Sequence, residues 1–325
     1  MKYVVVSINP GIDEFRYYAS KEDAISGKEP IRTERKSGSK GANCAIALAS
    51  LGARVEYFTV GKGEYGVDGY FSEYSEKITV RRTLTNAPER VNVKLIYPED
   101  GGISGMIEQN SKGGPLTNDE SETFLESVVS YARAEKSFGE FSTYIFTGSL
   151  PQNVEKEKYL CCISEISELG AYTVLDGKGE LISRASQNFP SLIKPNLDEW
   201  RELCANVGFL KTYQQNVEKS GEFSTQMLKS VRKLVEKWKS TVLLTLGERG
   251  FCYVDPDGCE FFFESKPRDL LFPAGMGDNL LSAFLYYTRS EKLSPKDAAK
   301  LAEEYAVNYG LTGKSEKADK NKYHI

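Results

Sequence analysis

The chain has 325 residues, 40% of them apolar and 27% charged, a composition typical of a soluble globular protein with room for a large α/β domain and an appendage. It contains one histidine, His324, beside the C-terminal Ile325. A Ser-His-Asp triad, a Cys-His pair and a histidine-ligated zinc site all need an imidazole inside the fold. These chemistries are excluded, so any catalysis must depend on Asp, Glu, Lys, Arg or backbone groups.

The charge balance also excludes several partners. Lys and Arg number 42 and Asp and Glu 46, which gives a net charge of −4 and no broad attraction for nucleic acid or anionic membranes. No window approaches the roughly 20 apolar residues of a membrane span, and the apolar start at 3–8 is too short for a signal peptide. Without a Cys-x-x-Cys pair, the cysteines are expected to be small buried residues in a reducing cytoplasm: Cys44, Cys161, Cys162, Cys204, Cys252 and Cys259.

Short β-rich runs alternate with helical patterns along most of the chain. Strands are predicted at 3–8, 55–60, 143–147, 172–175, 191–193 and 241–246. Helices are predicted at 42–51, 118–134, 156–169, 197–204, 225–238, 278–288 and 295–309. This alternation predicts an α/β fold with a doubly wound, mostly parallel sheet.

Two stretches break the alternation, at 13–35 and 90–108. Both have extended, charge-rich patterns without a helix between their strands, so we expect them to form a small β-sheet lid or an oligomer surface outside the main domain. The main domain is then expected to comprise residues 1–12, 36–89 and 109–312. The Lys-rich tail, 313–325, is expected to be solvated.

The segment Pro-Ala-Gly-Met-Gly-Asp at 273–278 opens an apolar helix. Its glycines allow a sharp turn whose amides, together with the positive helix end, form an anion site. Asp278 suits such a site only if it accepts a proton during turnover, as a general base for an alcohol does. A plain helix-capping carboxylate is the alternative.

A second glycine-containing loop, Ser-Gly-Ser-Lys-Gly-Ala-Asn at 37–43, also opens a helix. It lacks the spacing of a Walker A loop, but Lys40 and Asn43 could hold a polyhydroxylated or phosphorylated ligand. A capping loop is the alternative.

The segment Lys-Pro-Asn-Leu-Asp-Glu at 194–199 follows a predicted strand, where ligands bind in open parallel sheets. Lys194 could meet a polyphosphate, and Asn196 and Glu199 could hold the water shell of Mg²⁺ or form a capping box. The turn Thr-Leu-Gly-Glu-Arg-Gly at 245–250 ends a predicted strand, and its two glycines allow a close backbone approach at the same edge of the sheet.

Five segments in this order resemble the ribokinase-like (PfkB) family of sugar kinases. They are Ile-Asn-Pro-Gly-Ile-Asp at 8–13, Gly-Ser-Lys-Gly-Ala-Asn at 38–43, Gly-Ser-Leu-Pro at 148–151, Lys-Pro-Asn-x-x-Glu at 194–199 and Gly-Met-Gly-Asp at 275–278. The resemblance covers nearly the whole chain. It implies Mg²⁺-dependent transfer of the ATP γ-phosphoryl group to a sugar hydroxyl.

The resemblance also implies residue roles. Asp278 is similar to the catalytic base, and the amides of Gly275, Met276 and Gly277 to the anion hole. The sugar-binding positions correspond to Asp13, Gly38, Ser39, Lys40 and Asn43. The nucleotide positions correspond to Lys194, Asn196, Glu199, Thr245, Gly247 and Asn308, with Asn196 and Glu199 binding the metal through water.

Within the family, Glu-Arg-Val-Asn-Val-Lys at 89–94 is similar to the phosphosugar branch, which includes 1-phosphofructokinase, tagatose-6-phosphate kinase and minor 6-phosphofructokinase. Arg90, with Lys40 and Arg32, could supply the cations that a substrate phosphate needs. The resemblance also implies a lid that can pair two subunits into a homodimer. Ser39 and Met276 replace the family's usual glycine and alanine. An unphosphorylated sugar or nucleoside acceptor, or a silent sugar- or nucleotide-binding regulator, remains an alternative.

Overall fold

The computed structural model describes residues 1–62, 67–99, 104–185, 190–208, 223–266, 268, 270, 272, 274–314 and 316–317. His324 and most of the Lys-rich tail lie outside these residues, as does Pro273. In the described part of the chain, the strands form two separate sheets.

The larger sheet has nine described strands in the order β13-β12-β11-β10-β9-β8-β1-β4-β5. Pairs from β11 to β5 are parallel, whereas β12 and β13 add antiparallel strands at one edge, so the expected doubly wound, mostly parallel sheet is confirmed. The strands are β1 Lys2–Ser7, β4 Arg54–Gly61, β5 Ile78–Leu84, β8 Thr143–Thr147, β9 Tyr172–Asp176, β10 Leu192–Ile193, β11 Thr241–Thr245, β12 Phe251–Val254 and β13 Glu260–Phe263.

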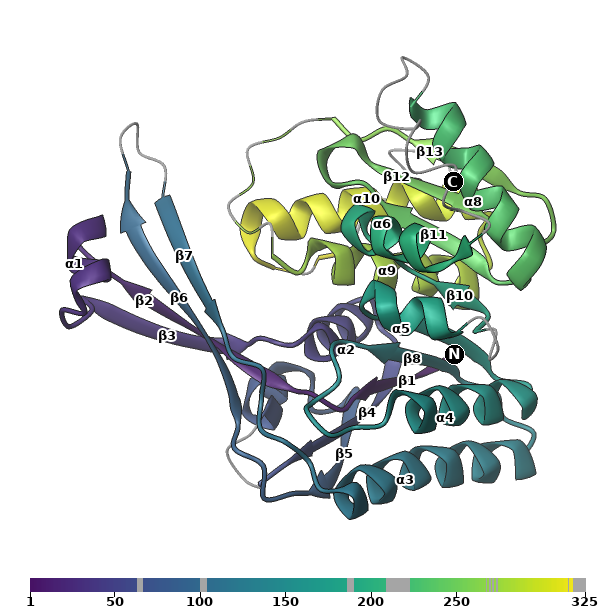
Figure 1. Ribbon diagram of the computed structural model, residues 1–325, viewed down its shortest axis with the longest axis horizontal. Helices are drawn as coiled ribbons and strands as arrows, with labels where there is room; N and C mark the ends of the chain where they lie inside the picture. Colours follow the sequence, from purple (N-terminus) through teal and green to yellow (C-terminus); the bar gives the residue numbers. More distant parts are fainter. Residues whose placement is uncertain are drawn as a thin grey trace.

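Helices cover both faces of this sheet (Figure 1). One face carries α2 Lys40–Ser50, α9 Met276–Leu285 and α10 Pro295–Thr312; the other carries α3 Asn118–Ser137, α4 Lys156–Glu168, α5 Gly179–Arg184, α6 Leu197–Asn206 and α8 Phe223–Trp238. Successive side chains of a strand point to opposite faces, so Val4 and Val6 enter one core and Tyr3 and Val5 the other. This double burial explains why β1 is a continuous apolar run.

The smaller sheet, in the order β3-β2-β6-β7, projects away from the main body (Figure 1). Its strands are β2 Gly11–Tyr17, β3 Arg32–Ser37, β6 Arg90–Pro98 and β7 Ser104–Asn110. The expectation of no helix in the first segment was wrong, because α1 Lys21–Ser26 joins β2 to β3. Ser20 caps this helix by accepting from the Asp23 amide, Gly27 ends it in the left-handed region, and Ala24 packs on the sheet.

The parallel strands bring distant segments to one edge. Asp176 ends β9, Lys194 follows β10, and Thr245 ends β11. In the portion described, no helix is both long enough and apolar enough to span a bilayer. All six cysteines are free; Cys161 is exposed and Cys259 partly exposed, which corrects the expectation that all are buried.

Candidate active site

Helix α9 begins at a left-handed glycine and buries an aspartate in its first turn. Gly275, the N-cap, has φ of 88°, a conformation that side chains disfavour. Asp278 is only 5% exposed, and its Oδ2 accepts a hydrogen bond of 2.9 Å from Asn43 Nδ2. No side chain caps α9, and the bond that Asp278 makes is to α2. The structure therefore joins the two glycine-containing motifs around one buried carboxylate.

A cationic side chain, that of Lys194, lies beside the glycine turn that opens α9. The first amides of a helix have no partner within it and carry partial positive charge. A Cβ atom on Gly277 would lie 3.7 Å from Lys194 Nζ, and one on Gly310 would lie 2.8 Å from Met276 Sδ. The Met276 side chain thus packs against α10, and its amide can serve as alanine's would.

A cluster of four charged residues adjoins this turn, in which Asp176 and Lys194 are buried and Lys40 is partly exposed. Asp176 Oδ1 lies 2.8 Å from Lys40 Nζ and 3.3 Å from Lys194 Nζ, and the Asp176 side chain is fully buried. Glu199 Oε1 lies 3.9 Å from Lys40 Nζ. Lys40, which was predicted to bind substrate, therefore forms an ion pair with Asp176.

These neighbours set the protonation states. Burial, opposed by Lys40 and reinforced by Asp176, raises the pKa of Asp278 to about 6. Burial would also raise the pKa of Asp176, but Lys194 and Lys40 hold it below its usual value. Burial would lower the pKa of Lys40, but the negative charges of Asp176, Asp278 and Glu199 outweigh it and raise that pKa. Burial raises the pKa of Glu199. At neutral pH Asp278 is ionised yet basic enough to accept a proton.

Asp13 is fixed in a second polar group on the small sheet. Its Oδ2 lies 2.6 Å from Lys94 Nζ, and its Oδ1 accepts 2.9 Å from Asn92 Nδ2. Lys94 is 5% exposed, so a buried cation holds the carboxylate in place. A Cβ atom on Gly38 would lie 2.1 Å from Asp13 Oδ1, which explains the glycine. The next residue, Ser39, turns its hydroxyl to the Ala42 amide at 3.2 Å and caps α2.

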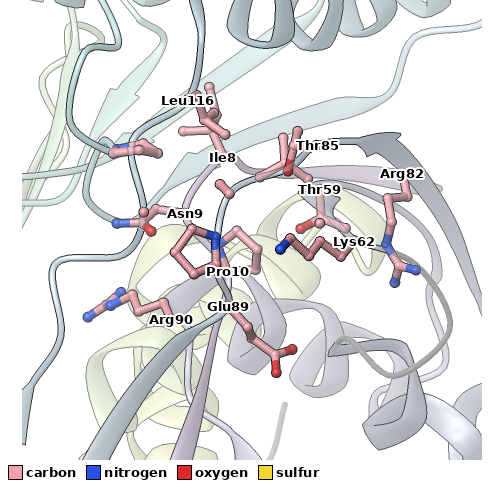
Figure 2. Close-up of a pocket in the computed structure, with 16 residues that line it drawn as sticks. Ile8, Asn9, Pro10, Thr59, Lys62, Arg82, Thr85, Glu89, Arg90 and Leu116 are labelled. Carbon is pink, nitrogen blue, oxygen red and sulfur yellow. The ribbon is translucent and has the colours of Figure 1, made fainter.

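Arg90 lies at the base of the small sheet, where Nε donates to the Ser111 carbonyl at 2.8 Å. Its stem borders a pocket of about 260 Å³ whose walls include Ile8, Pro10, Leu116 and Lys62. Figure 2 shows the Lys62 ammonium directed toward Pro10 and the Arg90 guanidinium directed away from the pocket. None of the residues around Asp278 lines this pocket, so the pocket is separate from that cluster.

The predicted nucleotide positions lie at neighbouring strand ends. Asn196 and Glu199 form the capping box of α6, with bonds of 2.9 Å in each direction. Thr245 donates its amide to the Pro195 carbonyl at 3.0 Å, and Gly247 follows with φ of 62°. Asn308 lies on α10, where its carbonyl accepts from Thr312.

Arg32 is not brought to this site. It begins β3 at the far end of the small sheet, beside α1 (Figure 1). There it lies 3.1 Å from Glu34 and over the Tyr17 ring.

Comparison with known proteins identifies the family. Residues 8–308 match the pfkB family of carbohydrate kinases. The chain belongs to this family. It is therefore a phosphotransferase with an alcohol group as acceptor.

Relatives agree with this membership. The chain is 25% identical over 290 residues to 1-phosphofructokinase of Bacillus subtilis (strain 168), covering 86% of this chain and 83% of the relative. It is 24% identical over 204 residues to tagatose-6-phosphate kinase of Staphylococcus epidermidis (strain ATCC 12228 / FDA PCI 1200), covering 62% and 61%. The crystal structure of Escherichia coli phosphofructokinase-2 with substrates and products has a TM-score of 0.78 at 19% identity, covering 100% and 97% of the two chains, and supports the fold.

Sequence reasoning missed three polar residues of this carbohydrate kinase: Asp176, Asn92 and Lys94 were given no role. Asp176 is the last residue of an ordinary buried strand, and its partner Lys40 is 136 positions away, so no local pattern marks it. The alternation of Arg90, Asn92 and Lys94 along one strand was a usable signal, because it puts all three on one face.

Proposed function

We propose that the protein transfers the γ-phosphoryl group of ATP to a hydroxyl of a phosphorylated ketohexose, namely fructose-1-phosphate, tagatose-6-phosphate or fructose-6-phosphate. The observation that carries this proposal is the buried Asp278, bonded to Asn43 and placed at a glycine turn beside Lys194. A proton acceptor beside an anion-binding helix start suits phosphoryl transfer to an alcohol.

In the proposed reaction, Asp278 accepts the proton of the attacking hydroxyl while that oxygen attacks the γ-phosphorus. The amides of Gly275, Met276 and Gly277 stabilise the negative charge on the phosphoryl oxygens, and Lys194 adds a positive charge. Asp13, Lys40 and Asn43 orient the acceptor, since positioning and electrostatics supply most of the catalysis in phosphoryl transfer.

The charged cluster fits a nucleotide with Mg²⁺. Asp176 Oδ2 is buried and has no hydrogen-bond partner among the described residues, which leaves it available to a cation or its water. Mg²⁺ keeps several waters and uses one or two carboxylates, so this site does not need a full set of protein ligands to hold it. Bound there, Mg²⁺ would neutralise charge on the phosphates. We assign binding of the nucleotide to Lys194, Asn196, Glu199, Thr245, Gly247 and Asn308, and binding of the metal, through water, to Asn196 and Glu199.

Arg90 is the residue we assign to the acceptor's phosphate. Among the described residues, Arg90 uses only Nε for a hydrogen bond, so its terminal nitrogens can form the paired bonds that a phosphate accepts. The names of the relatives, 1-phosphofructokinase and tagatose-6-phosphate kinase, support a phosphorylated acceptor.

A homodimer through the small sheet is part of the proposal. Its strand register sets Phe15, Tyr17 and Ile96 on the face opposite the one that α1 covers, and these side chains are partly exposed. Sedimentation of the wild-type chain tests this arrangement: a monomer at all concentrations contradicts it. A cytoplasmic location is also proposed, because free cysteines suit a reducing compartment.

The deciding experiment is coupled detection of ADP from ATP and Mg²⁺ across a panel of free sugars, nucleosides and phosphoketohexoses. We expect a phosphoketohexose to stimulate ADP release most strongly. Stimulation by a free sugar or nucleoside alone would support the neutral-acceptor alternative. Ligand binding without stimulation by any acceptor would support a silent regulator and overturn the proposal.

A further inference from the structure

Tyr309 lies in the last turns of α10, which pack firmly against the segment that opens α9. The Phe272 amide donates to the Gly310 carbonyl at 2.8 Å. A Cβ atom on Gly310 would lie 2.8 Å from Met276 Sδ, and one on Gly313 would lie 3.2 Å from the Phe272 ring. Two residues that follow Tyr309, Gly310 and Gly313, thus contact the segment that leads into the anion-binding turn, which holds this end of α10 against α9.

The Tyr309 hydroxyl lies beside the proposed reaction centre. A Cβ atom on Gly275 would lie 3.2 Å from this hydroxyl and 3.0 Å from Asn43 Nδ2. The phenol and the Asn43 amide therefore flank the same point of the glycine turn. Since Asn43 donates to Asp278, the phenol is close to the base.

This hydroxyl has no hydrogen-bond partner within the part of the chain that the structure describes. Tyr305, one turn earlier on α10, differs, because its hydroxyl lies 2.6 Å from Ser50 Oγ and donates to the Ala47 carbonyl at 3.1 Å. Burial raises the pKa of Tyr309, and Asp278 and Asp13 raise it further. The phenol is therefore neutral and can donate a hydrogen bond, and it lies within electrostatic range of both Asp278 and Asp13.

We propose that the Tyr309 hydroxyl donates a hydrogen bond to an oxygen atom of the bound acceptor, next to the hydroxyl that is phosphorylated. This inference rests on the proposed function, because it needs an acceptor between Asp13 and Asp278. A donor in a partly buried site is satisfied only by an acceptor atom, so Tyr309 discriminates against acceptors that lack an oxygen there.

The test compares Tyr309→Phe with Tyr305→Phe, which removes a hydroxyl from the same helix in the α2–α10 core. Steady-state kinetics use the phosphoketohexose, among the three named, that the wild type converts fastest. For Tyr309→Phe we expect kcat/KM for the acceptor to fall about three- to tenfold through a higher acceptor KM, with the KM for ATP unchanged. Tyr305→Phe should lower the melting temperature while leaving both KM values unchanged.

The other outcomes are distinct. Unchanged acceptor KM in Tyr309→Phe, or an equal rise in Tyr305→Phe, overturns the inference and leaves the proposed function intact. A lower kcat with both KM values unchanged assigns the hydroxyl to the transferred phosphoryl group and also overturns it. A wild type that converts none of the three sugars overturns the proposed function and this inference with it.

Discussion

Asn43 donates a hydrogen bond of 2.9 Å to Asp278, although 235 positions separate the two residues. The bond joins the start of α2 to the start of α9, so two helix ends converge on one carboxylate. It uses Oδ2 of Asp278 and fixes the orientation of the whole group. Removing either side chain should therefore change the chemistry of the other, which makes this pair a sensitive point for experiments.

The wild-type pH profile should report the ionisation of Asp278. A protonated base cannot accept the proton of the attacking hydroxyl, so kcat/KM should be high above the pKa and fall as pH decreases through about 6. Substrate phosphates also ionise near pH 6, so the wild-type profile alone does not assign the ionisation to Asp278. Variants that change only the pKa of Asp278 make that assignment.

Two variants should shift the acid limb of the profile, the pH range over which kcat/KM falls, in opposite directions. The Asn43 hydrogen bond lowers the pKa of Asp278, so Asn43→Ala should move the limb to higher pH. The Asp176 charge raises that pKa, so Asp176→Asn should move the limb to lower pH, because the repulsion from Asp176 is lost while Lys40 and Lys194 still favour the ionised form of Asp278. Circular dichroism checks folding of both. Limbs that coincide with the wild-type limb in both variants would assign the ionisation to substrate.

Arg90→Ala should weaken binding of a phosphorylated acceptor. Loss of hydrogen bonds to a charged group predicts a rise of about 10- to 100-fold in the acceptor KM, with the KM for ATP unchanged. The matched control is Arg32→Ala at the far end of the small sheet, which should leave the acceptor KM unchanged within one protomer. An equal rise in the control would indicate that a second copy brings Arg32 to the site; no rise for Arg90→Ala would contradict a phosphosugar acceptor.

Gly38→Ala should displace Asp13. The added Cβ would meet Asp13 Oδ1 at 2.1 Å and the Asp13 amide nitrogen at 2.3 Å, and the backbone atom cannot move aside cheaply. We expect a stability loss of about 1–3 kcal/mol from overpacking, measured by denaturant unfolding, together with a higher acceptor KM. Gly208→Ala, whose Cβ would meet nothing within 4 Å, is the control. A wild-type acceptor KM in Gly38→Ala would argue against a role for Asp13.

The sequence allowed prediction of the elements that have a strong period or cap. The capping box of Asn196 and Glu199 and the buried run of β1 were recognised because their signals are local. β5 was missed because it is an edge strand that carries Arg81 and Arg82, which weakens its apolar pattern. The predicted strands of the large sheet were recognised from the alternation of strands with helices. The β12–β13 hairpin was missed because no helix lies between its two strands.

Within the site, residues next to glycine turns could be predicted and their partners could not. Asp278 and Asn43 belong to local motifs, whereas the Lys94 partner of Asp13 is 81 positions away and depends on how β2 pairs with β6. Ser39 was predicted as a sugar-binding position, with helix capping as the alternative for its loop, and its hydroxyl caps α2. The pairing of Asp13 with Lys94 depends on a tertiary contact that no local pattern encodes.

The most direct test of the account is turnover by Asp278→Asn in the coupled ADP assay, with ATP, Mg²⁺ and the phosphoketohexose that the wild type prefers. Asp297→Asn, a capping-turn aspartate at the start of α10, is the matched control and should keep wild-type turnover. For Asp278→Asn the account predicts a fall in kcat of about 10²- to 10⁴-fold with nucleotide binding unchanged. Undiminished turnover in folded Asp278→Asn would contradict it.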